Sequence, residues 1–119
     1  MITIDLTGKT ALSTGAAAGS GLAAVEIFAK AGATVALNHL PDDPRGAEQV
    51  ARLKAEGHKI VAAPGNVAVP VEAEAMVGRA IEALGRLDYL FNNAGTPATP
   101  APLPFPELDR LTEGFWQTL

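Results

Sequence analysis

Residues 14–21 read Thr-Gly-Ala-Ala-Ala-Gly-Ser-Gly, and this stretch decides the fold. It follows the short apolar run Lys9–Thr14, which we interpret as a buried strand. It leads into Ser20–Ala31, where apolar residues recur at helical spacing and Gly32 follows as a helix-ending residue. Backbone N–H groups and the helix dipole at such a strand-to-helix turn favour negative charge. The stretch therefore predicts a phosphate-binding loop.

Each glycine of this loop has an expected task. Gly15 makes the tight turn out of the strand, Gly19 lets backbone approach the phosphates, and Gly21 lets the helix pack close to the sheet. The spacing G-x-x-x-G-x-G differs from the G-x-G-x-x-G of the commonest dinucleotide motif, and alone it also fits simple turn chemistry. The strand–turn–helix context favours the phosphate site. Ser20 is interpreted as a helix-start residue.

The rest of the chain alternates strands with helices. The pattern predicts strands at Thr34–Asn38, Lys59–Ala63 and Leu87–Asn92, a turn-rich loop at Pro41–Gly46, and helices over 47–56 and 70–84. Strands that alternate with helices form βαβ units with right-handed crossovers and a parallel sheet. We expect an α/β fold in three layers, with helices on both faces of the sheet and the strand order 3-2-1-4, in a single domain over residues 1–119.

The amino-acid composition of the sequence changes after Gly95, where prolines become frequent. Residues 96–106 include prolines at positions 97, 100, 102, 104 and 106, which predicts an extended surface loop. Residues 107–119 resume a helical pattern with Leu108, Leu111 and Phe115, and we expect the start of a truncated helix there.

A second polar signal stands where the fourth strand ends, at Asn92-Asn93-Ala94-Gly95. Ligands of open α/β sheets bind at the carboxyl ends of the strands, where the strand order reverses. In the order 3-2-1-4 this crevice lies between the first and fourth strands, so both signals line it. The alternative is that Asn92-Asn93 simply end a strand and Gly95 permits the turn that follows, with no ligand involved. The expected convergence of residues 14–21 and 92–95 on one crevice argues against this alternative.

Together, the Thr-Gly-x-x-x-Gly-x-Gly and Asn-Asn-Ala-Gly motifs resemble the pattern of the short-chain dehydrogenase/reductase family, and the resemblance spans Leu6 to Leu119. It implies a Rossmann-type fold that binds NAD or NADP, with the glycines at the pyrophosphate and Asn93, Ala94 and Gly95 near the adenosine. The expected cofactor-binding residues are Thr14, Gly15, Gly19, Ser20, Gly21, Leu22, Asn38, His39, Asn66, Val67, Asn93, Ala94 and Gly95.

Two departures from the family pattern concern the cofactor. Where the family has an aspartate that accepts from the adenine amino group, this chain has Asn66-Val67, whose amide accepts without charge. At the end of the second strand an acid selects NAD and a basic residue selects NADP, but this chain has Asn38-His39-Leu40. The choice between NAD and NADP is therefore open. For His39 we weigh contact with a 2′-phosphate against a solvated loop histidine, and favour the second.

The family's catalytic tyrosine is followed four residues later by lysine. The single tyrosine here is Tyr89, four residues before Asn93, and packing within an apolar strand explains it. We assign no catalytic residue. The resemblance implies an NAD(P)-dependent oxidoreductase acting on a carbonyl or alcohol, of which this chain is the cofactor-binding half, cut before the catalytic half and inactive alone. A small-molecule substrate is expected only in a full-length form. The alternative is a non-catalytic nucleotide-binding or protein-interaction module.

Composition excludes other classes of function. The net charge is −4 without a Lys/Arg cluster, so we expect no nucleic-acid partner. There is no cysteine, and His39 and His58 are far apart, so no metal is assigned. No stretch reaches the ~18 apolar residues of a membrane span, and no leader is evident, which predicts a cytoplasmic protein without membrane contact. The fourth strand lacks a neighbour on its far side, and we expect a homo-oligomer.

Overall fold

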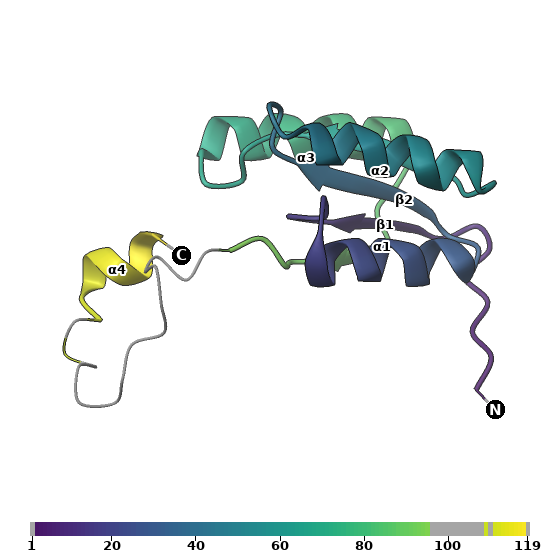
Figure 1. The fold of residues 1–119 in the computed structure, drawn as a ribbon, viewed down its shortest axis with the longest axis horizontal. Coiled ribbons are helices and arrows are strands. Elements are labelled where there is room, and N and C mark those ends of the chain that lie inside the picture. Colours follow the sequence, from purple (N-terminus) through teal and green to yellow (C-terminus); the bar gives the residue numbers. More distant parts are fainter. Residues whose placement is uncertain (1, 96–108, 110, 119) are drawn as a thin grey trace.

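The computed structural model describes residues 2–95, 109 and 111–118. The elements follow in the order β1 (Thr10–Ser13), α1 (Gly19–Lys30), β2 (Thr34–His39), α2 (Pro44–Ala55), β3 (Ile60–Pro64), α3 (Pro70–Leu84), β4 (Tyr89–Phe91) and α4 (Glu113–Thr118). The strands form one parallel sheet of four in the order β3-β2-β1-β4 (Figure 1). The predicted strand order is confirmed.

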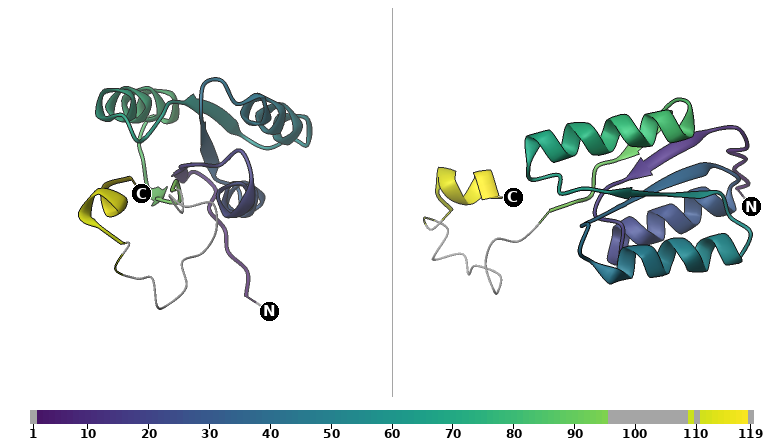
Figure 2. Two further views of the ribbon diagram at one scale, coloured as in Figure 1. Left: turned by 60° about the vertical axis from the view of Figure 1, so that its left-hand side comes forward. Right: turned by 90° about the horizontal axis from the view of Figure 1, so that it is seen from above.

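Helices cover the sheet on both faces, as predicted. Figure 2 shows α3 on one face and α1 with α2 on the opposite face. Side chains alternate along β2, so Val35 and Leu37 pack toward α1 and α2, with Leu53 among their neighbours. Ala36 points to the other face and packs with Met76 of α3. Most of the core is Ala, Val and Leu, which lets helices lie close to the sheet.

Two helix starts differ from the prediction. The helix α2 begins at Pro44, inside the expected loop Pro41–Gly46. Asp43 caps it by accepting from the backbone N–H of Arg45, and proline suits the first turn because its missing N–H would have no partner there. The helix α1 begins at Gly19, and its capping position is Ala18 without a side-chain cap. Ser20 therefore lies in the first turn and does not cap the helix.

The strand β4 forms one edge of the sheet. Its side chains are exposed, at 39% for Tyr89, 54% for Leu90 and 38% for Phe91. Tyr89 stacks on Phe28 of α1 with 5.9 Å between ring centroids, which agrees with a packing role for its ring. This edge is the one predicted to lack a neighbouring strand.

Beyond Gly95, the predicted proline-rich loop at 96–106 lies outside the described residues. The following helix, expected from residue 107, is described as α4 from Glu113, and Leu111 and Thr112 precede it without helical structure. Among the helices of the described ranges, none is both long enough and apolar enough to cross a membrane.

Candidate functional site

A cavity of about 640 Å³ lies where the parallel strands end. Seven predicted site residues line it, namely Gly15, Asn38, Asn66, Val67, Asn93, Ala94 and Gly95. Four further lining residues were not predicted, namely Leu40, Gly65, Ala68 and Gln117. Leu40, Gly65 and Ala68 directly adjoin predicted residues, and the rule that ligands bind beyond strand ends is the signal that could have found them.

The glycine loop between β1 and α1 depends on backbone shapes and close contacts that only glycine allows. Gly15 and Gly19 have φ of +59° and +60°, in the left-handed region. A Cβ on Gly15 would lie 2.9 Å from the Cα of Ala94, and a Cβ on Gly21 would lie 2.6 Å from the carbonyl oxygen of Gly15. Gly19 faces open space instead, with no heavy atom within 4 Å of such a Cβ. The loop is tightly packed on one side and accessible at Gly19.

Hydrogen bonds join the glycine loop to the segment after β4. The hydroxyl oxygen of Thr14 accepts from the backbone N–H groups of Asn93 and Ala94, each at 3.0 Å. The side-chain amide of Asn93 donates back to the carbonyl oxygens of Thr14 and Gly15 at 3.2 and 3.3 Å. The two motifs that the sequence predicted to share a crevice are therefore in direct contact.

Asn38 connects the ends of three strands. Its side chain is buried; the amide oxygen accepts from the N–H of Gly15 at 3.0 Å, and the amide nitrogen donates to the carbonyl oxygens of Ala63 and Gly65 at 2.9 and 3.1 Å. Its backbone oxygen also accepts from Ala16 at 2.8 Å. These bonds hold the glycine loop, the end of β2 and the end of β3 at fixed separations. Asn38 lines the cavity while its amide bonds to the protein itself.

Asn66 shapes the turn between β3 and α3. Its side-chain oxygen accepts from the N–H of Ala68 at 3.0 Å, and its own N–H donates to the carboxylate of Glu72 at 3.3 Å. An amide oxygen has two lone pairs, so the Asn66 side chain, which lines the cavity, keeps one further acceptor position.

His39 is not the solvated loop histidine that we favoured from the sequence. It is the last residue of β2 and is only 8% exposed. A Cβ on Gly46 would lie 2.1 Å from the Cγ of His39, so the imidazole packs directly against the backbone of α2. Its Nδ1 lies 2.8 Å from the carbonyl oxygen of Leu40; because a carbonyl only accepts, Nδ1 carries the proton. The ring does not line the cavity.

The lining of the cavity is uncharged. The remaining predicted residues Ser20 and Leu22 lie in the first turns of α1, exposed and half-buried respectively. At the start of α2, the N-cap residue Asp43 forms an ion pair with Arg45 at 2.8 Å. Hydrogen bonds from Arg45 hold the pKa of the Asp43 carboxyl below its ordinary value. Over the described ranges, no three His, Cys, Asp or Glu side chains gather as a metal site would require. A lining of this kind offers amide groups and backbone N–H groups, and the glycine loop beside it leads into the positive end of α1.

Comparisons with known proteins agree with this geometry. The family model described as short chain dehydrogenase matches residues 9–116. The chain is 41% identical over 90 residues to L-rhamnose 1-dehydrogenase (NAD(P)(+)) of Sphingomonas sp. strain SKA58, a match covering 76% of this chain and 35% of that protein.

Solved structures give the same result. L-sorbose reductase from Gluconobacter frateurii, complexed with NADPH and L-sorbose, superposes with a TM-score of 0.79 and 32% identity, covering 98% of this chain and 42% of the reductase. A short-chain dehydrogenase/reductase from Burkholderia phymatum, in complex with NAD, gives 0.72 and 34% identity, covering 82% of this chain and 34% of that one. The chain thus spans between a third and a half of the length of these relatives. With its motifs, its sheet and the family match in agreement, the chain belongs to the short-chain dehydrogenase/reductase family.

Proposed function

We propose that the cavity binds the ADP half of NAD(H) or NADP(H). The observation that carries the proposal is the meeting of three segments at one cavity, namely the glycine loop, the turn at Asn66 and the segment Asn93–Gly95. Gly15 and Gly21 let the loop pack against Ala94 and against its own backbone, where a Cβ would collide, and the N-terminus of α1 adds a partial positive charge for the pyrophosphate. Gly19, Ser20 and Leu22 belong to the same proposed phosphate contact, as the open space at Gly19 allows.

In a longer protein this cofactor site would serve an oxidoreductase, with the nicotinamide supplying or accepting a hydride and a carbonyl or alcohol as substrate. The residues of this chain would bind and orient the dinucleotide. They include no tyrosine with lysine four positions later. Carbonyl reduction needs a positioned acid to protonate the oxygen, so the chain alone should not reduce a ketone. A cytoplasmic location belongs to the same proposal, and cell fractionation tests it.

Gly19→Val tests the phosphate contact directly. A branched side chain would project into the open space at Gly19, so titration calorimetry with NADH, NADPH and ADP should show binding to the unsubstituted chain and at least tenfold weaker binding to the variant. Valine at a positive φ also costs about 1–3 kcal/mol of strain, which calls for a control with the same penalty.

Gly57→Val supplies that control. Gly57 has φ of +93°, no heavy atom lies within 4 Å of a Cβ there, and it follows α2 away from the cavity. This variant should lose stability and keep its affinity for ADP. Equal loss of binding in both variants, or no binding of any of the three ligands by the folded chain, would contradict the proposed function.

A second candidate is a protein-interaction module that uses β4. The exposed edge with Tyr89, Leu90 and Phe91 favours it, because an unpaired strand offers N–H and C=O groups to another chain. The two candidates differ in their nucleotide dependence: ADP should change the stability of the chain only if the first is right, by the usual coupling of binding to folding.

A further inference from the structure

The three residues Asn38, His39 and Leu40 determine what the cavity presents to the adenosine ribose. In doubly wound dinucleotide-binding folds, an acid about 20 residues beyond the glycine motif holds the ribose 2′-hydroxyl, while an arginine nearby accommodates a 2′-phosphate. In this chain the end of β2 stands at that place. If the proposed function is right, its choice between NAD(H) and NADP(H) depends on which of these three side chains faces the ribose.

Two of the three are already engaged elsewhere. The Asn38 amide bonds to Gly15, Ala63 and Gly65, which uses both of its donor hydrogens. The His39 ring packs against Gly46 of α2 on the face of the sheet opposite α3, away from the cavity lining. Asn38 cannot bind a 2′-phosphate without breaking these hydrogen bonds, and the His39 ring is only 8% exposed and lies outside the cavity lining.

Leu40 is the side chain that lines the cavity at this point, and it is 47% exposed. It offers no acceptor to a hydroxyl and no charge to a phosphate. It is apolar where either kind of selective residue would stand.

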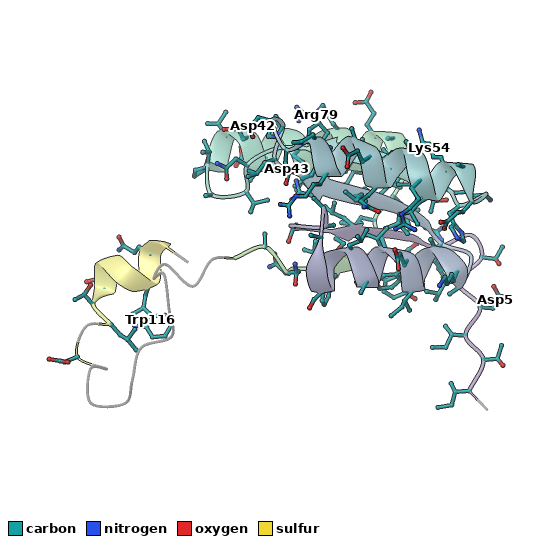
Figure 3. The ribbon with its side chains drawn as sticks, in the orientation of Figure 1. Asp5, Asp42, Asp43, Lys54, Arg79 and Trp116 are labelled. Carbon is teal, nitrogen blue, oxygen red and sulfur yellow. The ribbon has the colours of Figure 1, made fainter. Side chains whose placement is uncertain are left out.

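The charged side chains around Leu40 do not compensate. Asp42 and Asp43 project from the turn before α2 (Figure 3), and the guanidinium of Arg45 is bonded to Asp43. Arg79 of α3 donates to the carbonyl oxygen of Pro64 and lines a smaller cavity beside Glu72. The turn before α2 and the first turn of that helix thus hold two carboxylates against one guanidinium, a small excess of negative charge that mildly disfavours a phosphate.

We propose that Leu40 makes the cavity nearly indifferent to the 2′-phosphate. The chain binds NADH and NADPH with dissociation constants within tenfold of each other, NADH being the tighter ligand. This inference rests on the proposed function and adds its selectivity.

The test is a titration of the whole chain with NADH and with NADPH. Backbone amide chemical shifts in NMR spectra are the readout, because they measure weak binding well. Three variants accompany it at constant pH and ionic strength. Leu40→Arg should shift the ratio of dissociation constants at least tenfold toward NADPH, because a guanidinium pairs with phosphate. Leu40→Met, similar in size and uncharged, should leave the ratio within twofold of the original. His39→Gln should also leave the ratio unchanged, even if both affinities fall together.

The outcomes separate the two proposals. A ratio beyond tenfold in the unsubstituted chain, or no shift in Leu40→Arg, overturns the inference while nucleotide binding itself still supports the proposed function. Selective loss of NADPH binding in His39→Gln also overturns it, because His39 would then contact the phosphate. Binding of neither dinucleotide by the folded chain overturns the proposed function and the inference with it.

Discussion

At the scale of single residues, Asn38 holds the glycine loop in place, which the glycines cannot do by themselves. Glycine permits the turn of the loop but also leaves it flexible, and the three side-chain hydrogen bonds of Asn38 fix that turn against β3. Every buried side-chain nitrogen or oxygen within the described part of the chain has a hydrogen-bond partner. The cavity therefore has its shape before a ligand enters, which reduces the cost of ordering the loop on binding.

Asn38→Asp should destabilise the chain by about 2–4 kcal/mol at pH 7, since the substitution replaces a donor with a buried negative oxygen facing two carbonyl oxygens. The pKa of the introduced carboxyl would be raised by these neighbours. Its penalty is then present above the folded pKa and relieved as the pH falls through it, so the difference from the unsubstituted chain should shrink between pH 7 and pH 4.

Urea denaturation at both pH values measures this difference. Asn92→Asp is the matched control, because Asn92 is an exposed amide near the same strand ends and its replacement should change stability by less than about 0.5 kcal/mol. Equal stabilities for the two variants at pH 7 would show that Asn38 does not hold the loop.

The sequence predicted the residues of the site better than their orientations. Gly15 and Gly21 could be assigned from the motif, because a turn and a close helix-to-sheet contact both require glycine. The roles of His39 and Leu40 depend on how α2 lies on the sheet, and the contact between His39 and Gly46 joins residues whose packing no local pattern describes. The cofactor contacts themselves stay predictions.

At the scale of elements, hydrophobic periodicity was enough to order the strands and helices. The fold class and the order 3-2-1-4 were predictable because right-handed crossovers leave few arrangements. Element ends were less predictable. The loop before α2 was expected to reach Gly46, whereas Asp43 caps the helix and starts it at Pro44. Caps depend on single side-chain bonds, which periodicity does not register.

Asp88 anchors the entry into β4. Its carboxylate accepts from the N–H of Thr10 at 2.9 Å and from Nε of Arg86 at 3.0 Å. These hydrogen bonds, that of Thr10 first, hold the pKa of Asp88 below its ordinary value of 3.8. Its folded pKa lies below the unfolded one, so the carboxylate stabilises the fold above the unfolded pKa and this contribution is lost as the pH falls through the folded pKa.

Asp88→Asn should therefore lower the urea midpoint at pH 7 and flatten its dependence on pH below about 4. Glu82→Gln, at an exposed position of α3, is the control and should leave both the midpoint and the acid side of the curve nearly as they are. An Asp88→Asn curve parallel to that of the unsubstituted chain down to pH 2.5 would contradict the anchoring role.

At the scale of the whole molecule, two observations concern the edge of the sheet: the relatives are longer than this chain, and β4 is exposed at that edge. The chain spans 35% of the L-rhamnose dehydrogenase and 42% of the L-sorbose reductase. Its sheet ends at β4 with an exposed apolar edge. We expect this edge to associate with a second copy of the chain, because unpaired strand edges with apolar side chains pair with other strands.

Light scattering over a concentration series should thus show a mass that rises above that of the monomer. Leu90→Lys should weaken the association, since a charge on an edge strand opposes pairing. Ile27→Lys changes an apolar side chain on α1 that is 69% exposed and should leave the mass as it is. A monomeric mass at every concentration, with a cooperative melt, would show that the edge does not associate.

The most direct test of the nucleotide cavity is an NMR titration of the whole chain with ADP. The glycine amides report on it because they lie both inside and outside the cavity. We expect saturable shifts at Gly15, Gly65 and Gly95, which line the cavity, and none at Gly57 and Gly85, which follow α2 and α3. Shifts of equal size at all five glycines, or an unchanged spectrum from the folded chain at millimolar ADP, would contradict it.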